Sequence, residues 1–268
     1  MKVYIPTCDS HLFVIKGFSH FFNKYWGDDF DVKILGFSKP DFELPRNFEF
    51  ISMAEEQVGG AKGWSNYLID FFNSINDEYF IFGIDDFCLA RPLDRELYYI
   101  LESIPNWKGE MGENIGRIDL QPSLQYARQP EDTTIYKSFE DLDFDIIELN
   151  QRSRNQFIYR ITGQFSIWNR EYFLKTLEPN WSPHDWELIG GRKAEGDGYK
   201  ILGTKNRHCV KKVELVSEGQ YPNKINVKGM REEDIEKVKE IYADRPEEIG
   251  EFKEEWPFEN WIDIVYGK

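Results

Sequence analysis

Two adjacent aspartates, Asp85 and Asp86, directly follow an almost wholly apolar run over residues 79–84. Neighbouring carboxylates repel each other unless a cation or hydrogen-bond donors offset their charge. Hard divalent cations such as Mg²⁺ and Mn²⁺ take oxygen ligands of this kind, commonly together with phosphate oxygens. In the alternative interpretation, one carboxylate caps a turn and the other points to solvent. We favour a metal site, because the pair comes at the end of an apolar run that is typical of a buried strand.

The residues before this pair alternate between predicted strands and predicted helices. Apolar residues spaced three and four apart predict helices over 14–25 and 64–75. Strands are predicted from four apolar runs: residues 3–5, 32–37, 48–51 and 79–84. The order β-α-β-β-α-β predicts an α/β fold, with a mixed, mostly parallel sheet flanked by helices. Ligands of such sheets bind beyond the carboxyl ends of the strands, which is where the aspartate pair stands.

The second half of the chain is less regular. Its predicted elements are two strands over 157–161 and 164–168, and two helices over 171–177 and 232–242. Between the halves, residues 131–149 contain seven acidic side chains, and we expect this stretch to be exposed to solvent.

Composition narrows the classes of protein and partner. The chain has 268 residues, of which 41% are hydrophobic and 16% aromatic, so we expect a substantial core. Its formal net charge of −15 disfavours general electrostatic binding to nucleic acid. No apolar run approaches the roughly 20 residues that a membrane span needs, and the three cysteines form no CxxC pair. We therefore expect a cytoplasmic protein with neither a disulfide framework nor a zinc cage.

The strand order and the acidic pair together resemble the nucleotide-binding half of a GT-A-type glycosyltransferase. In that family an Asp-x-Asp-like motif ends a central strand and holds the metal ion and the diphosphate of a sugar nucleotide. This chain has Ile84-Asp85-Asp86, a departure from the strict motif that is similar to bacterial and phage-type members. Three further segments are similar to the family, so that the resemblance covers about residues 1–230: residues 64–68, 167–174 and 182–187.

The resemblance implies transfer of a sugar from a nucleotide-sugar donor, a UDP-sugar first among them, to a hydroxyl of a saccharide acceptor. It implies a metal-assisted and inverting reaction. It also implies a catalytic domain over 1–230, with a nucleotide-sugar-binding half at 1–110 and an acceptor half at 111–230. Residues 231–268 are then expected to form a helical extension that packs on this domain.

Specific roles follow from the same resemblance. Asp85 and Asp86 would hold Mn²⁺ or Mg²⁺, with His208 as a further ligand. The nucleotide sugar would also contact Thr7, Asp9 and Trp64. An alternative for the first loop is that Asp9 or Ser10 caps the first helix.

The resemblance places the acceptor near residues 182–187. Glu187 would be the base that activates the acceptor hydroxyl, with Asp185 as the second choice, and Trp186 would contact the acceptor. Pro183 predicts a helix start, and the helix dipole would keep these carboxylates ionised. Acidic residues are also common at helix starts without any catalytic role.

Competing functions differ in the motifs that they require. A sugar nucleotidyltransferase needs a glycine-rich phosphate loop after the first strand, whereas residues 6–10 contain no glycine. No P-loop and no Rossmann fingerprint is present either. Two alternatives stay open: a glycosyltransferase that acts on a modified DNA base, as some phage enzymes do, and a non-catalytic carbohydrate- or nucleotide-binding protein.

Overall fold

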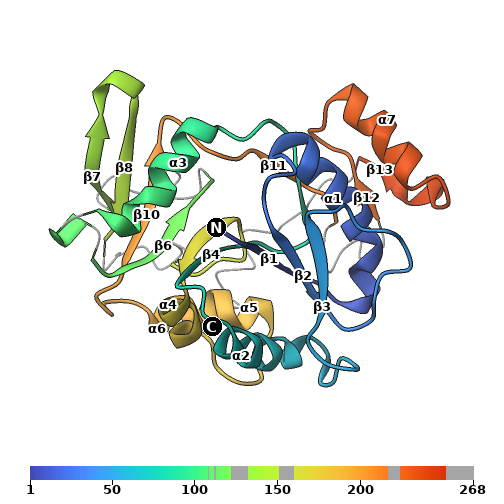
Figure 1. The fold of residues 1–268 in the computed structure, drawn as a ribbon, viewed down its shortest axis with the longest axis horizontal. Coiled ribbons are helices and arrows are strands. Elements are labelled where there is room, and N and C mark those ends of the chain that lie inside the picture. Colours follow the sequence, from blue (N-terminus) through green and yellow to red (C-terminus); the bar gives the residue numbers. More distant parts are fainter. Residues whose placement is uncertain (108, 112, 122–131, 151–159, 217–223, 252–268) are drawn as a thin grey trace, which may run out of the picture.

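A nine-stranded sheet runs through the computed structural model of the chain (Figure 1), which describes residues 1–107, 109–111, 113–121, 132–150, 160–216 and 224–251. The strand order is β3-β2-β1-β4-β9-β6-β10-β8-β7. The strands are β1 (Val3–Pro6), β2 (Val32–Gly36), β3 (Phe48–Ser52), β4 (Tyr79–Phe82), β6 (Ile115–Asp119), β7 (Thr133–Phe139), β8 (Phe144–Leu149), β9 (Ser166–Asn169) and β10 (Lys200–Lys205). The main helices are α1 (Leu12–Tyr25), α2 (Trp64–Ser74), α3 (Arg95–Ser103), α4 (Arg170–Thr176) and α7 (Glu232–Ile241).

The sheet is mixed, and most of its strands point the same way. β3, β2, β1 and β4 are parallel to one another. β9 runs antiparallel between β4 and β6, and β8 runs antiparallel between β10 and β7. The predicted fold class, a mostly parallel mixed sheet with flanking helices, is thus confirmed. The chain builds outward from β1 to β2 and β3 and then returns to place β4 on the other side of β1, so a topological switch point lies between β1 and β4.

Helices cover both faces of the first half of the sheet, and the strands alternate accordingly. Ile5 of β1 and Ile81 of β4 pack with α1 in one core cluster, whereas Tyr4 and Phe82 pack with α2 in the other. Because both faces of β4 are covered, its sequence is apolar throughout. A Cβ atom added at Gly83, directly after β4, would lie 2.6 Å from the Phe165 ring, so the close approach of these segments requires glycine.

The C-terminal helix α7 lies against α1 (Figure 1) and is held there by a buried charge. The Asp234 carboxylate, 1% exposed, accepts hydrogen bonds from Lys24 Nζ at 2.6 Å and Tyr25 Oη at 2.6 Å. The Tyr242 hydroxyl, just past the helix, accepts a hydrogen bond from the Gly17 amide at 3.0 Å. The part of the expected extension that the structure describes therefore packs on the α/β layer, and residues 252–268 lie outside the described residues.

The acidic stretch 131–149 differs from expectation. Its residues form β7 and β8, a hairpin at the end of the sheet, drawn at the left of Figure 1. Phe144 and Ile146 of β8 face one core cluster, and Ile147 and Leu149 face the other. The prediction of an exposed stretch holds for Glu140, Asp141 and Asp143, which are exposed. It fails for β8, because apolar residues interleaved with the acidic ones bury this strand on both faces.

Most other predicted elements are present with small shifts of their bounds. The predicted strand at 164–168 is β9 and the helix at 171–177 is α4. The predicted strand at 157–161 falls largely outside the described residues. No helix in the part of the chain that the structure describes has the length and apolar character needed to cross a membrane.

Candidate active site

Two carboxylates and an imidazole meet where β1 and β4 end. Asp85 and Asp86 follow β4, and His11 ends the short helical turn Asp9–His11 that follows β1. His11 Nδ1 lies 3.9 Å from Asp85 Oδ1 and 3.7 Å from Asp86 Oδ1. Because β1 and β4 are parallel neighbours, their carboxyl ends bring these side chains to the same edge of the sheet. One nitrogen and two carboxylate oxygens within 4.8 Å of one another form a donor set that fits a divalent cation.

Thr7 fixes the orientation of the first aspartate. Its hydroxyl donates a hydrogen bond of 2.6 Å to Asp85 Oδ2, and both side chains are buried. Asp86 is more exposed, and its backbone carbonyl accepts hydrogen bonds from the amides of Leu215 (2.7 Å) and Val216 (3.3 Å). The pair therefore has a buried, oriented member, Asp85, and a partly exposed member, Asp86.

The first loop also connects two strand ends. The Asp9 carboxylate accepts hydrogen bonds from the Ser38 amide at 2.9 Å and from its hydroxyl at 2.8 Å. No side-chain cap is made at the start of the turn Asp9–His11 or of α1. The alternative that Asp9 or Ser10 caps the first helix is therefore wrong, and Asp9 instead fastens the end of β1 to the segment after β2.

Glu187 stands in a helical segment that contains a wide, π-helical turn. The segment runs from α5 (Pro183–Asp185) through the turn Trp186–Gly190 to α6 (Gly191–Lys193). Glu187 Oε1 accepts a hydrogen bond of 2.6 Å from the Gly163 amide. The Gly163 carbonyl in turn accepts one of 2.9 Å from the Ile84 amide, one residue before Asp85. Glu187 is thus linked through one glycine to the segment that presents the aspartate pair.

The two carboxylates of this helical segment titrate in opposite directions. Desolvation by the surrounding protein raises the pKa of Glu187, although hydrogen bonds from Gly163 and Thr162 oppose the shift. Hydrogen bonds from the Ser182 amide and hydroxyl lower the pKa of Asp185. The expectation that the helix dipole keeps both carboxylates readily ionised therefore fails for Glu187, where burial outweighs it.

Asp185 caps the start of α5 together with Ser182. Its Oδ2 accepts hydrogen bonds from the Ser182 amide at 3.0 Å and hydroxyl at 2.7 Å, while Ser182 Oγ accepts one from the Asp185 amide at 3.1 Å. This reciprocal capping box satisfies backbone donors at the helix start. The predicted helix start at Pro183 is confirmed, and Asp185 is committed to capping it.

The tryptophan expected to touch an acceptor lies in the core. Trp186 is 0% exposed and donates a hydrogen bond of 2.9 Å from Nε1 to Thr176 Oγ1. Its ring is 5.3 Å from Phe173 and 5.5 Å from Trp64, measured between ring centroids. Because no face of the indole is left for a sugar, the prediction of an acceptor contact was wrong. Trp186 is a core residue, and the partly exposed Trp64 packs against it.

His208 is not part of the acidic cluster. It follows β10, which stands three strands from β4 in the sheet, about 14 Å at ordinary strand spacing. Its Nδ1 lies 3.3 Å from Thr204 Oγ1, and burial lowers its pKa. The structure thus corrects the metal-ligand assignment: among the residues it describes, His11 and not His208 accompanies the aspartate pair. The sequence does place His11 only a few residues after β1. This position points to the aspartate pair only if β1 and β4 are known to be neighbours.

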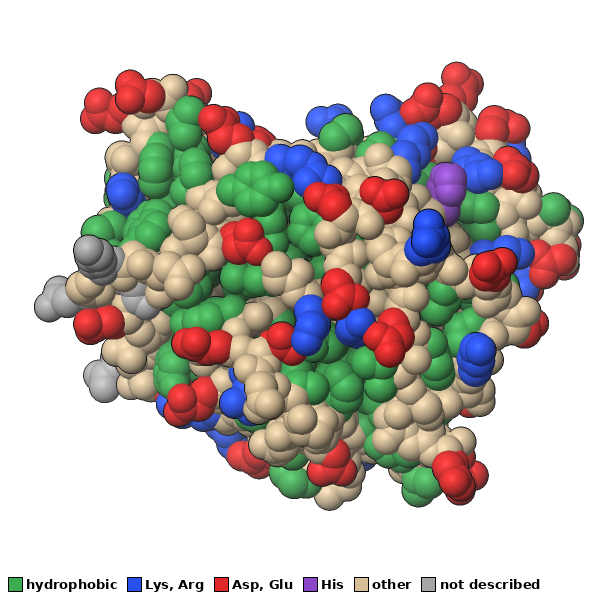
Figure 2. Space-filling view, viewed as in Figure 1, with side chains coloured by type: hydrophobic (Ala, Val, Ile, Leu, Met, Phe, Trp, Pro, Cys, Tyr) green, Lys and Arg blue, Asp and Glu red, His purple; other side chains and the backbone are tan. Residues whose placement is uncertain are grey.

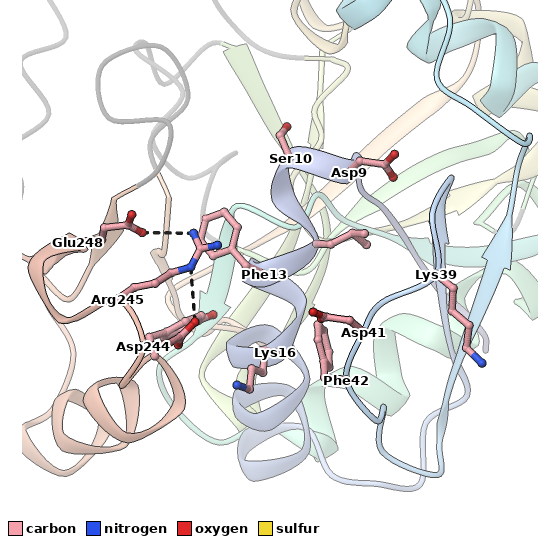
Figure 3. Close-up of a pocket in the computed structure, with 12 residues that line it drawn as sticks. Asp9, Ser10, Phe13, Lys16, Lys39, Asp41, Phe42, Asp244, Arg245 and Glu248 are labelled. Carbon is pink, nitrogen blue, oxygen red and sulfur yellow. Dashed lines mark hydrogen bonds and ion pairs between the residues drawn. The ribbon is translucent and has the colours of Figure 1, made fainter.

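A cavity of about 840 Å³ lies beside this site rather than within it. It is bounded by α1, the loop after β2 and the segment after α7, as Figure 3 shows with Phe13, Phe42 and Arg245 around it. Asp9 and Ser10 belong to its lining, but His11 and the aspartate pair do not. The candidate metal site at the ends of β1 and β4 is therefore separate from this cavity, and two of its three side chains, those of His11 and Asp85, are buried.

Comparison with known proteins gives structural matches only. No family model matches the chain, and no curated protein matches its sequence. The structure is similar to S. aureus TarS 1–349 in complex with UDP, with a TM-score of 0.47 and 11% identity over 78% of this chain and 60% of that chain. It is also similar to the mannosyltransferase PcManGT from Pyrobaculum calidifontis in complex with GDP-Man and Mn²⁺, with a TM-score of 0.44 and 13% identity over 82% and 58%.

A third similar structure is a CMP:2-keto-3-deoxy-manno-octonic acid synthetase complexed with CTP, with a TM-score of 0.41 and 12% identity over 75% of this chain and 88% of that one. The chain spans only 60% of TarS 1–349 and 58% of PcManGT. A mannosyltransferase is thus among the structures that this chain resembles.

Proposed function

We propose that the chain is a glycosyltransferase that moves a sugar from a nucleotide-sugar donor to an acceptor hydroxyl with the help of a divalent cation. The observation that supports it most is the cluster of His11, Asp85 and Asp86 at the switch point between β1 and β4. Ligands of open α/β sheets bind at such a point. A divalent cation there is suited to a diphosphate, which would otherwise be repelled by the two carboxylates.

The cation, Mn²⁺ or Mg²⁺, would supply charge neutralisation for the leaving diphosphate. Asp85 and Asp86 hold it, and Thr7 keeps Asp85 in the ligating orientation through the hydrogen bond to Oδ2. Asp9 holds the loops after β1 and β2 together, where we propose that the nucleoside binds. Trp64, partly exposed at the start of α2, offers an aromatic face to the sugar.

Glu187 is the proposed base for the acceptor hydroxyl. A base works best when its pKa lies near the working pH, and burial moves the pKa of Glu187 upward in that direction. Its hydrogen bond to the Gly163 amide holds the carboxylate beside the segment that leads to Asp85. A base opposite the leaving group suits a single, inverting displacement, and we include this stereochemistry in the proposal. Asp185 is the weaker choice, because its carboxylate caps the helix.

The acceptor is proposed to be a saccharide rather than DNA. The net charge is −15. On the face shown in Figure 2, lysine and arginine side chains alternate with acidic ones and form no continuous basic band. Because DNA binding draws its affinity from phosphate contacts, this face offers little to a duplex. Retention of the protein on duplex DNA that weakens with salt would favour the modified-base alternative.

A screen of sugar nucleotides tests the proposal. Purified protein is incubated with UDP-, GDP- and CMP-sugars with Mn²⁺, Mg²⁺ or EDTA, and release of the nucleotide is measured. We expect metal-dependent release from one donor, abolished in Asp86→Ala. Metal-dependent binding of a donor without any release, with or without added saccharides, would instead indicate a non-catalytic binding protein. Activity that survives Asp86→Ala unchanged would show that the site lies elsewhere.

A further inference from the structure

We propose that His11 is the third protein ligand of the cation held by Asp85 and Asp86, and that its nitrogen makes the site prefer Mn²⁺ to Mg²⁺. This inference rests on the metal part of the proposed function and specifies the identity of the ion. His11 belongs to the turn after β1, whereas Asp85 and Asp86 follow β4.

The spacing of the three side chains suits a shared ion. The separations of 3.9 and 3.7 Å from His11 Nδ1 to the two carboxylate oxygens exceed a hydrogen bond, which spans about 2.7–3.2 Å. Ligand atoms that each lie about 2.1 Å from a common ion are roughly 3–3.5 Å apart. An ion could therefore be held after these separations shorten by roughly 0.2–0.9 Å.

The surrounding contacts turn the ligand atoms toward one another. Because Thr7 occupies Asp85 Oδ2, it is the other oxygen, Oδ1, that faces His11. The backbone amide of His11 donates a hydrogen bond of 2.9 Å to the Cys8 carbonyl, and 7% of its side chain is exposed. Contacts that orient ligands in this way are typical of metal sites. Asp86 is the more exposed of the two carboxylates, with 17% of its side chain exposed against 8% for Asp85.

A nitrogen ligand changes which ion is preferred. Mg²⁺ favours oxygen ligands and dehydrates reluctantly, whereas imidazole is a good ligand for first-row transition ions. A site made only of Asp85 and Asp86 would accept Mg²⁺ readily. Adding the His11 nitrogen shifts the preference toward Mn²⁺. The competing explanation is that His11 forms ion pairs with the two carboxylates and binds no metal. In that case Mn²⁺ would not be bound through a nitrogen ligand.

Electron paramagnetic resonance tests the proposal without any turnover. The affinity for Mn²⁺ is measured from the signal of the free ion, the affinity for Mg²⁺ by competition, and nitrogen ligation from the ¹⁴N modulation of the bound Mn²⁺ echo. We expect ¹⁴N modulation in the wild type and in the control variant His208→Ala, and its loss in His11→Ala. In His11→Asp, which exchanges the nitrogen for an oxygen, the ratio of Mn²⁺ to Mg²⁺ affinity should fall by about tenfold.

Each other outcome overturns the proposal. Bound Mn²⁺ without ¹⁴N modulation in the wild type would exclude His11 as a ligand and leave the proposed function intact. Modulation that is lost in His208→Ala would return the ligand to the segment after β10. No binding of Mn²⁺ to the wild type would contradict both this inference and the metal part of the proposed function. The wild-type spectrum decides even if a variant fails to fold, and circular dichroism identifies such a variant.

Discussion

The edge formed by β1 and β4 and the helical segment 183–193 both supply carboxylates, but they hold them in different ways. Asp85 and Asp86 directly follow a strand, and Thr7 and His11 complete their surroundings from the neighbouring strand. Glu187 reaches its position through a π-helical turn and a hydrogen bond to Gly163, 24 residues away in sequence. The first region is built for binding a cation, and the second places a single carboxylate whose proton affinity is raised. Substitutions in the two regions should therefore affect different steps.

Replacement of Glu187 by glutamine should have the largest effect on turnover. Removal of a general base costs about 10²- to 10⁴-fold in rate. The amide oxygen can still accept the hydrogen bond from Gly163, so we expect donor and metal affinity to stay close to wild type. Steady-state kinetics together with calorimetric titration of the nucleotide measure both quantities. If Glu187→Gln lowered donor affinity as strongly as turnover, the two regions would not act on separate steps.

The pH dependence of the rate also distinguishes Glu187 from the carboxylates at the ends of β1 and β4. The pKa of Glu187 is raised above its ordinary value of 4.5, and the base must be deprotonated to act. The rate should therefore fall as the pH drops through this raised pKa, at a higher pH than for an ordinary glutamate. Measurement of kcat/KM against pH should show this acid limb in the wild type and not in Glu187→Gln. An unchanged limb in the variant would assign it to another group.

Trp186→Ala should cause the largest loss of stability. The side chain is wholly buried among Trp64, Phe173 and Trp168, and removal of a buried tryptophan costs about 3–5 kcal/mol. Trp64→Ala, at a partly exposed position in contact with Trp186, should cost less stability and weaken binding of the sugar nucleotide instead. Denaturant unfolding and donor titration of both variants check this. A stable Trp186→Ala with weakened acceptor use would restore the original prediction of an acceptor contact.

Asp185→Ala should have the smallest effect. Loss of the capping contact with Ser182 costs about 1 kcal/mol of stability at neutral pH. Because the folded-state pKa of Asp185 is lowered, its contribution is present above the unfolded pKa and is lost as the pH falls through the folded pKa. Thermal unfolding of wild type and variant should therefore differ near pH 7 and converge in acid. A strong loss of turnover in this variant would make Asp185 the base in place of Glu187.

The sequence predicted the features that depend on local order. The apolar run before Asp85 defines a buried strand, and the position of two carboxylates at its end follows from chain direction alone. The same holds for the helix start at Pro183, because proline and the Ser182 cap act within one turn. For these elements, sequence neighbours are also spatial neighbours.

The features that sequence analysis missed depend on how strands are ordered in space. His11 joins Asp85 only because β4 pairs with β1, although the two residues are 74 positions apart in the sequence. His208 was misplaced because β9 and β6 separate β10 from β4. Trp186 was misjudged because its burial depends on Trp64, Trp168 and Phe173, which come from α2, β9 and α4.

Binding of a nucleoside diphosphate is the most direct test of the proposed metal site. Calorimetric titration with UDP, GDP or CDP is performed in Mn²⁺ and in EDTA, with the wild type, Asp86→Ala and the matched control Glu187→Gln. We expect binding of at least one diphosphate that requires Mn²⁺, is kept in Glu187→Gln and is lost in Asp86→Ala. Binding that is unaffected by EDTA or by Asp86→Ala, or no binding of any diphosphate in Mn²⁺, would contradict it.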